Sequence, residues 1–128
     1  MNFIDRLKVS FIFRSKDRVE ASMPVDENCH QPFGFLHGGA TIALLETVAS
    51  EGAWLNCGPN EITFGVDVHV AHRSSMKSGR LLSEATLAKE EPTSKGYRKQ
   101  TWNVRAYRED DTTVSEGEII CLIVPDKR

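Results

Sequence analysis

One long helical pattern over residues 40–56 constrains the fold more than any other feature, because it is apolar on nearly every side. At about 100° per residue, bulky Leu44, Val48 and Leu55 fall on one side. The other side carries one carboxylate, Glu46, among mostly small residues, which are Gly39, Ile42, Ala43, Ala49, Ser50 and Ala53. A helix of this kind is typically buried inside a domain. We therefore expect Glu46 to face a gap or a partner.

Six further segments alternate apolar and polar residues, which is typical of β-strands. The clearest covers residues 62–70, and the others cover residues 9–13, 19–25, 81–89, 98–108 and 113–124. A short helical piece over residues 3–8 precedes them, and residues 26–35 form a loop before the long helix. The last three strands indicate an antiparallel meander. The pattern as a whole predicts an α+β fold in which a curved antiparallel sheet wraps one long central helix.

Length and composition set the class of protein. A chain of 128 residues without an internal repeat suits one domain, residues 1–128, and its formal charge of -2 gives no reason to expect a nucleic-acid partner. No apolar run is long enough for a signal peptide or a membrane span. Three widely spaced cysteines, Cys29, Cys57 and Cys121, indicate free thiols in a reducing compartment. We expect a cytoplasmic domain whose partner is a small molecule or another copy.

The start of the long helix indicates chemistry. A His37-Gly38-Gly39 turn leads into it, and glycines leave backbone N–H groups accessible where the helix dipole is positive. Such a helix start holds anions and can stabilise an oxyanion. Glu46 lies two turns further on, where a carboxylate can attack a carbonyl carbon or remove a proton from water. Both roles stay open.

The run over residues 30–39, His-Gln-Pro-Phe-Gly-Phe-Leu-His-Gly-Gly, followed by Glu46 and Ser50, closely resembles the hot-dog acyl-CoA thioesterases. Within them it is most similar to the group of phenylacetate-pathway, Arthrobacter-type 4-hydroxybenzoyl-CoA and 1,4-dihydroxy-2-naphthoyl-CoA thioesterases. Residues 20–26 and the strand ending in His72 extend the resemblance weakly over most of the chain. It implies a hot-dog fold and a homodimer with two sites at its interface, usually paired into a homotetramer.

The resemblance also implies roles for individual residues. Glu46 corresponds to the catalytic carboxylate, and the backbone N–H of Gly38 to the donor that polarises the thioester carbonyl. His37 supports this turn, and Gln31 corresponds to a glutamine that orients carbonyl or water. The hydroxyl positions near the reacting group correspond to Thr47 and Ser50.

The residues that contact the phosphates of coenzyme A in this family are matched less well. His72 corresponds to a histidine that relatives use near these phosphates, but the arginine expected two residues later is Ser74 here. Arg73 lies one position off this register. Either a local shift brings Arg73 into use, or another cation supplies the charge, the candidates being Lys77, Arg80 and Arg98.

Structural interpretations compete with several of these roles. Glu46 could be a buried structural carboxylate, but its small-residue surroundings and the His-Gly-Gly turn favour a reactive one. His69 is expected to be exposed. The aromatic residues Phe33, Phe35, Trp54 and Phe64 are expected mainly in the core, with one or two lining an acyl slot. Cys29, His30 and His37 fit no zinc spacing, so we expect no metal and no cofactor.

Taken with the resemblance, these residues predict hydrolysis of an acyl-CoA to free acid and coenzyme A. The acyl group is expected to be aromatic or medium-sized, for instance a benzoyl or 1,4-dihydroxy-2-naphthoyl group. Thiolates leave readily, so the lack of a Ser-His-Asp triad is no objection. Two alternatives stay open. A non-catalytic acyl-CoA sensor needs no carboxylate beside the thioester, and a hydroxyacyl-carrier dehydratase requires a His-Phe-Pro type signature that Pro32-Phe33-Gly34 does not supply.

Overall fold

Helices and strands follow one another along the chain in the predicted order in the computed structural model, which describes residues 1–128. Helix α1 (Phe3–Leu7) leads into β1 (Ser10–Arg14), β2 (Arg18–Val25) and a 3-10 turn, η1 (Glu27–Cys29). The long helix α2 (Gly38–Leu55) is followed by β3 (Glu61–His72), β4 (Gly79–Pro92), β5 (Arg98–Tyr107) and β6 (Thr113–Pro125). Helix α2 starts two residues earlier than predicted, because the side chain of His37 caps it. Neither helix has both the length and the apolarity to cross a lipid bilayer.

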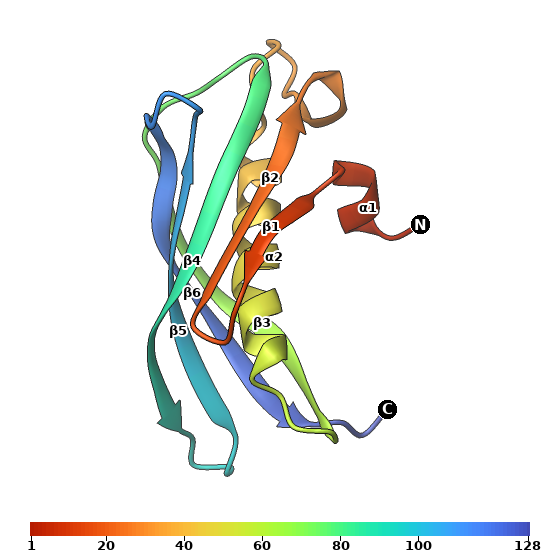
Figure 1. Ribbon diagram of the computed structural model, residues 1–128, viewed down its shortest axis with the longest axis vertical. Helices are drawn as coiled ribbons and strands as arrows, with labels where there is room; N and C mark the ends of the chain where they lie inside the picture. Colours follow the sequence, from red (N-terminus) through yellow and green to blue (C-terminus); the bar gives the residue numbers. More distant parts are fainter.

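The six strands form one antiparallel sheet in the order β1-β2-β4-β5-β6-β3, which curves around α2 (Figure 1). Strands β4, β5 and β6 make the predicted meander. The chain enters β3 directly after α2, and β3 lies at the far edge of the sheet, where it pairs with β6 alone. One side of β3 therefore has no neighbouring strand, and this strand stands beside the exposed flank of α2.

The contact between helix and sheet differs from the predicted arrangement. Ala49 and Ala53 are fully buried in the core rather than facing the same way as Glu46. The sheet packs closely on this side of the helix: Trp102 of β5 is fully buried, and a Cβ at Gly52 would be 2.2 Å from its ring. The small residues of α2 thus make room for a large aromatic ring in the sheet.

Replacing Trp102 by alanine is expected to lower the free energy of unfolding by about 3 to 5 kcal/mol, because a fully buried ring is lost and its cavity stays. Chemical denaturation measures the change. Trp54→Ala is the matched control, since that ring is 51% exposed and its loss should cost far less. Equal losses for the two tryptophans would contradict this account of the core.

The expectation that aromatic residues lie mainly in the core is wrong for three of them. Phe33, Trp54 and Phe64 are 82%, 51% and 55% exposed. Phe35 is half-buried, and the Lys77 Nζ lies 4.9 Å from the centre of its ring. Trp54 on α2 and Phe64 on β3 flank a region that the sheet leaves open. Periodicity had assigned an apolar side to each element, but no strand or helix of this chain covers these two rings.

Candidate active site

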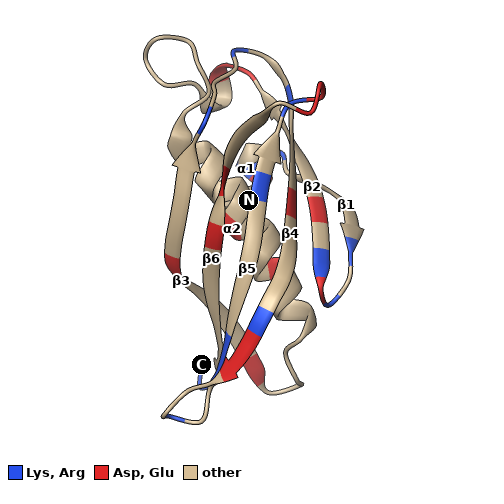
Figure 2. Ribbon diagram, turned by 90° about the vertical axis from the view of Figure 1, so that its left-hand side faces the viewer, with Lys and Arg blue, Asp and Glu red and all other residues tan.

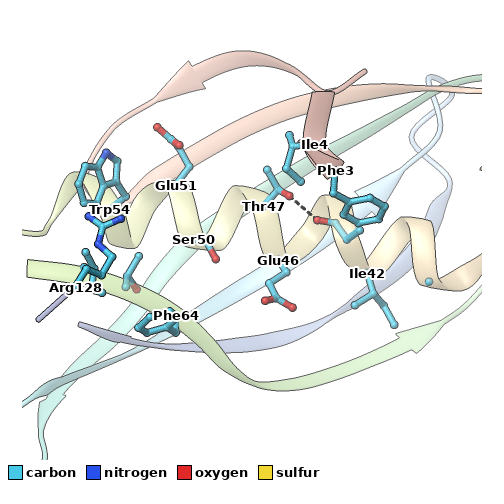
Figure 3. A pocket seen from close by; sticks show the side chains of 14 residues that line it. Phe3, Ile4, Ile42, Glu46, Thr47, Ser50, Glu51, Trp54, Phe64 and Arg128 are labelled. Atoms are coloured by element: carbon cyan, nitrogen blue, oxygen red, sulfur yellow. Dashed lines mark hydrogen bonds between the residues drawn. The ribbon is translucent and has the colours of Figure 1, made fainter. Parts of the chain in front are cut away.

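A groove of about 790 Å³ runs along α2 on the side away from the core. Helix α2 forms one wall with Glu46, Thr47 and Ser50, which the sequence had singled out, and β3 forms the other with residues that include Phe64 (Figure 3). Further wall residues are Phe3 and Ile4 of α1 and Trp54 of α2. The groove therefore combines two carboxylates, Glu46 and Glu51, and the hydroxyls of Thr47, Ser50 and Thr63 with largely apolar walls, as a site for an apolar acyl group requires.

The carboxylate of Glu46 is half-buried and points toward β3 (Figure 3). It takes part in none of the ion pairs of the chain. Instead it lies against Gly65, where an added Cβ would be 2.6 Å from Oε2 of Glu46. A carboxylate with no cationic partner keeps its lone pairs available for attack on carbon or for taking a proton.

Cys121 lies beneath this carboxylate, paired with Gly65 in the register between β6 and β3. Burial raises the pKa of its thiol to about 11; a contact with Ser50 works in the opposite direction, and the charge of Glu46 raises the pKa further. The thiol therefore stays protonated near neutral pH and is a poor nucleophile. Of these two neighbouring groups, Glu46 is therefore the candidate nucleophile and Cys121 is not.

The start of α2 has the geometry of an anion site. The N–H of Gly39 donates to Nδ1 of His37 over 2.8 Å, so the ring of His37 serves as the N-cap. The N–H of Gly38 belongs to the first turn, whose N–H groups have no acceptor within the helix. His37 thus accepts from one of the two glycine N–H groups, and that of Gly38 has no acceptor within the helix.

His37→Ala is expected to lower the free energy of unfolding by about 1 kcal/mol, because the helix loses its N-cap. Asparagine and aspartate both restore a cap, so His37→Asn and His37→Asp should recover most of this loss. Aspartate also adds a negative charge beside the Gly38 N–H, so its kcat for thioester hydrolysis should be lower than that of the asparagine variant. Thermal unfolding and steady-state kinetics measure the two effects. Equal kcat values would contradict an anion at this N–H.

Gln31 lies in the loop that leads to this helix start. His72, at the end of β3, lies beside the helix start itself. Oε1 of Gln31 accepts from the N–H groups of Phe33 and Phe35 at 2.6 and 3.2 Å, so its carbonyl fixes the loop and its amide nitrogen remains to donate. The ring of His72 packs on Gly38, where an added Cβ would be 2.6 Å from Nε2. Its Nδ1 is 2.6 Å from Oγ of Ser115. Sequence reasoning missed this contact between His72 and Gly38.

The two cations predicted to bind substrate lie elsewhere in this protomer. Arg73 pairs with Glu116 at 3.2 Å and lines a hollow on the outer face of the sheet, the charged face seen in Figure 2 with α2 behind it. Of the other candidates, Arg80 donates to Oγ of Ser22 at 2.7 Å, and Ser74, in the place of the expected arginine, donates to the carbonyl of Thr113 at 2.7 Å.

Arg98 lies at the C-terminal end of α2, a helix of 18 residues and thus about 27 Å long. Its guanidinium donates to Glu61, to Glu90 and to the carbonyl of Asn56. A hydrogen bond from the Gly58 N–H, and next to it Arg98, hold the pKa of Glu61 below its usual value. Arg98 therefore ties the end of the helix to β3 and β4.

Sequence reasoning gave no site role to two residues beside Glu46, Gly65 and Cys121, although it expected Cys121 to be a free thiol. A glycine inside a strand often marks a bulge or a close approach, and that signal was present at Gly65. Nothing in the local sequence singles out Cys121, which reaches the site only through the pairing of β6 with β3. Nowhere in the chain do three His, Cys, Asp or Glu side chains come together as a metal site.

Comparison with known proteins gives one consistent result. A sequence model described as the thioesterase superfamily matches residues 33–115. The 1,4-dihydroxy-2-naphthoyl-CoA hydrolase of Escherichia coli is 32% identical over 94% of this chain and 80% of its own length. The proofreading thioesterase EntH of Cronobacter turicensis is 31% identical over 83% of this chain and 74% of its own length.

Solved structures agree with the sequence comparison. The crystal structure of a mutant thioesterase from Pseudomonas aeruginosa superposes with a TM-score of 0.88 at 28% identity, over 97% of this chain and 86% of that one. The sheet and the central helix thus have counterparts in a solved thioesterase structure. The chain therefore belongs to the thioesterase superfamily, has its hot-dog fold and is a thioester hydrolase.

Proposed function

We propose that this chain hydrolyses an acyl-coenzyme A whose acyl group is aromatic or medium-sized. The carboxylate of Glu46, without an ion-pair partner in an apolar-walled groove, carries the proposal. The exposed rings of Trp54 and Phe64 in the same groove support an aromatic acyl group. The name of the Escherichia coli relative, a hydrolase of 1,4-dihydroxy-2-naphthoyl-CoA, supports it too.

In one form of the reaction, Glu46 attacks the thioester carbon and the carbonyl oxygen becomes an oxyanion that accepts from the Gly38 N–H. The C–S bond then breaks, coenzyme A leaves as a thiolate, and water hydrolyses the resulting anhydride. In the other form, Glu46 takes a proton from a water molecule that attacks the same carbon, and this proton passes to the leaving thiolate. Either form uses one carboxylate and one N–H donor. The N–H donor alone is worth about 3 to 4 kcal/mol of transition-state stabilisation.

The spacing of these two groups favours a site shared between protomers. Gly38 and Glu46 are eight residues apart on α2, or about 12 Å along the helix axis. One carbonyl has to lie within about 3 to 3.5 Å of both groups, which this spacing disfavours within one protomer. Strand β3 offers an open edge with Phe64, Val66 and Val68 exposed at 55%, 51% and 37%. We therefore propose a homodimer formed through β3, in which Gly38 of one protomer lies near Glu46 of the other.

A panel of aromatic and aliphatic acyl-CoA substrates, with release of free thiol as the readout, tests the proposed reaction. Benzoyl-type substrates should release coenzyme A with the highest kcat/KM. Tight acyl-CoA binding without thiol release across the whole panel would identify a non-catalytic binding module instead. Light scattering at micromolar concentration should give a dimer or tetramer mass, and a monomer would refute the shared site.

Mixed dimers test the sharing directly. A protomer with Glu46→Ala and a protomer with Gly38→Pro each lack one of the two groups. If the site is shared, their heterodimer contains one site with both groups and should show about half the activity of the wild-type dimer. If each protomer holds its own site, the heterodimer should be as inactive as the two parents.

A further inference from the structure

The carboxylate of Glu46 occupies the space where a side chain on β3 would begin. A Cβ built at Gly65 would lie 2.6 Å from Oε2, 2.9 Å from Cδ and 3.1 Å from Cγ of Glu46. The register between β3 and β6 also shifts here, since Gly65 pairs with Cys121 and Asp67 with Ile120, leaving Val66 as an extra residue in β3. A bulge of this kind redirects the strand locally, and such bulges are frequent next to active sites.

Other tightly packed glycines of the chain face parts of the fold. A Cβ at Gly117 would lie 1.9 Å from the backbone oxygen of His69, and one at Gly52 would meet the buried ring of Trp102. Neither neighbour can move without disturbing the sheet or the core. The neighbour of Gly65 is the far end of one half-buried side chain, which can swing away. An added methyl group at Gly65 would therefore displace the carboxylate rather than the fold.

We propose that Gly65 is a positioning residue for the hydrolytic reaction: its missing side chain lets the Glu46 carboxylate lie against β3, in the orientation from which it acts. This inference rests on the proposed function. A Cβ at this position forces the carboxylate toward the open groove, where water hydrates it and its distance to the thioester carbon changes. A misplacement of about 1 Å can lower a rate about a hundredfold.

Gly65→Ala is the direct test. We expect kcat to fall about 10- to 100-fold, with KM within about threefold of wild type and the thermal midpoint nearly unchanged, because only the carboxylate moves. Gly58→Ala is the matched control, since a Cβ there would also meet a glutamate carboxylate, Oε1 of Glu61 at 3.3 Å, outside the groove. This control should keep the wild-type kcat. Wild-type kcat in Gly65→Ala, or a large fall of its thermal midpoint, would overturn the positioning role.

A double-mutant cycle separates this role from an independent effect of the strand. In the Glu46→Ala background the carboxylate is gone, so Gly65→Ala should change the residual rate by less than twofold. A full 10- to 100-fold loss in that background would show that Gly65 acts without Glu46, and would overturn the inference. If Glu46→Ala itself keeps full activity, the proposed function fails. If Glu46→Ala is inactive and Gly65→Ala is fully active, only the role of Gly65 fails.

Discussion

Glu46→Ala is expected to lower kcat for acyl-CoA hydrolysis by about 10²- to 10⁴-fold. This is the usual contribution of a side chain that takes a proton from the attacking water, and the variant also lacks the carboxylate that could attack the thioester itself. The affinity for acyl-CoA should change little, because the apolar walls of the groove stay in place. Stopped-flow or steady-state thiol release gives kcat, and equilibrium binding of a non-hydrolysable analogue gives the affinity. A large loss of affinity with unchanged kcat would assign Glu46 to binding rather than to chemistry.

Two further variants sharpen this result. Glu46→Gln keeps the shape of the side chain and should be nearly as inactive as alanine, since an amide is neither a nucleophile nor a base at neutral pH. Glu84→Gln is the matched control, because Glu84 is also half-buried but lies on the outer face of the sheet, paired with Arg18. In a single turnover in ¹⁸O-labelled water, label found in Glu46 would identify the anhydride form, since only hydrolysis of an anhydride at the glutamyl carbon leaves label in the protein.

Gly38→Pro is expected to lower kcat by about 10²- to 10³-fold, the usual effect of removing one oxyanion donor. Proline has no N–H and is well tolerated at the first position of a helix. The preceding residue must then be extended, and His37 already is, with φ of -71° and ψ of 129°. The substitution thus removes the donor at a place where the backbone accepts proline.

Gly38→Ala controls for the space beside the helix start. Both substitutions add a Cβ against the ring of His72, but alanine keeps the N–H. The ratio of their kcat values therefore removes the effect of the Cβ on the histidine ring, and we expect alanine to be at least about tenfold more active because it keeps the N–H. Equal losses in both variants would trace the effect to the displaced histidine ring and would remove the oxyanion role from Gly38.

Much of the fold could be predicted because the local periodicity of apolar and polar residues identifies most helices and strands. The alternation of residues 62–70 and the helical pattern after His37 each identify an element from its own residues, and the observed β3 and α2 follow them closely. The His-Gly-Gly turn likewise identified the helix start, since glycine and a capping side chain act within a few residues of one another. Element ends were less accurate, because caps and pairing partners decide where a helix or strand stops.

Contacts between elements could not be predicted in this way. Periodicity placed Ala49 and Ala53 with Glu46, but both are fully buried in the core, and Gly52 beside Ala53 lies against the ring of Trp102 in a distant strand. Arg73 and Arg98 were candidates for the same phosphates, yet Arg73 lies on the outer face of the sheet and Arg98 at the far end of α2. The positive charges of these two arginines are evident in the sequence, whereas the direction in which each side chain points depends on the sheet.

The sequence by itself determined the family resemblance, the order of helices and strands, and the helix start with its carboxylate two turns later. Only the tertiary structure decided what surrounds that carboxylate: β3 crosses to the edge of the sheet beside α2, and its pairing with β6 brings Gly65 and Cys121 under Glu46. The physical reason is that a propensity acts between neighbours along the chain, whereas this site is formed by strand register and by close packing between segments far apart in sequence.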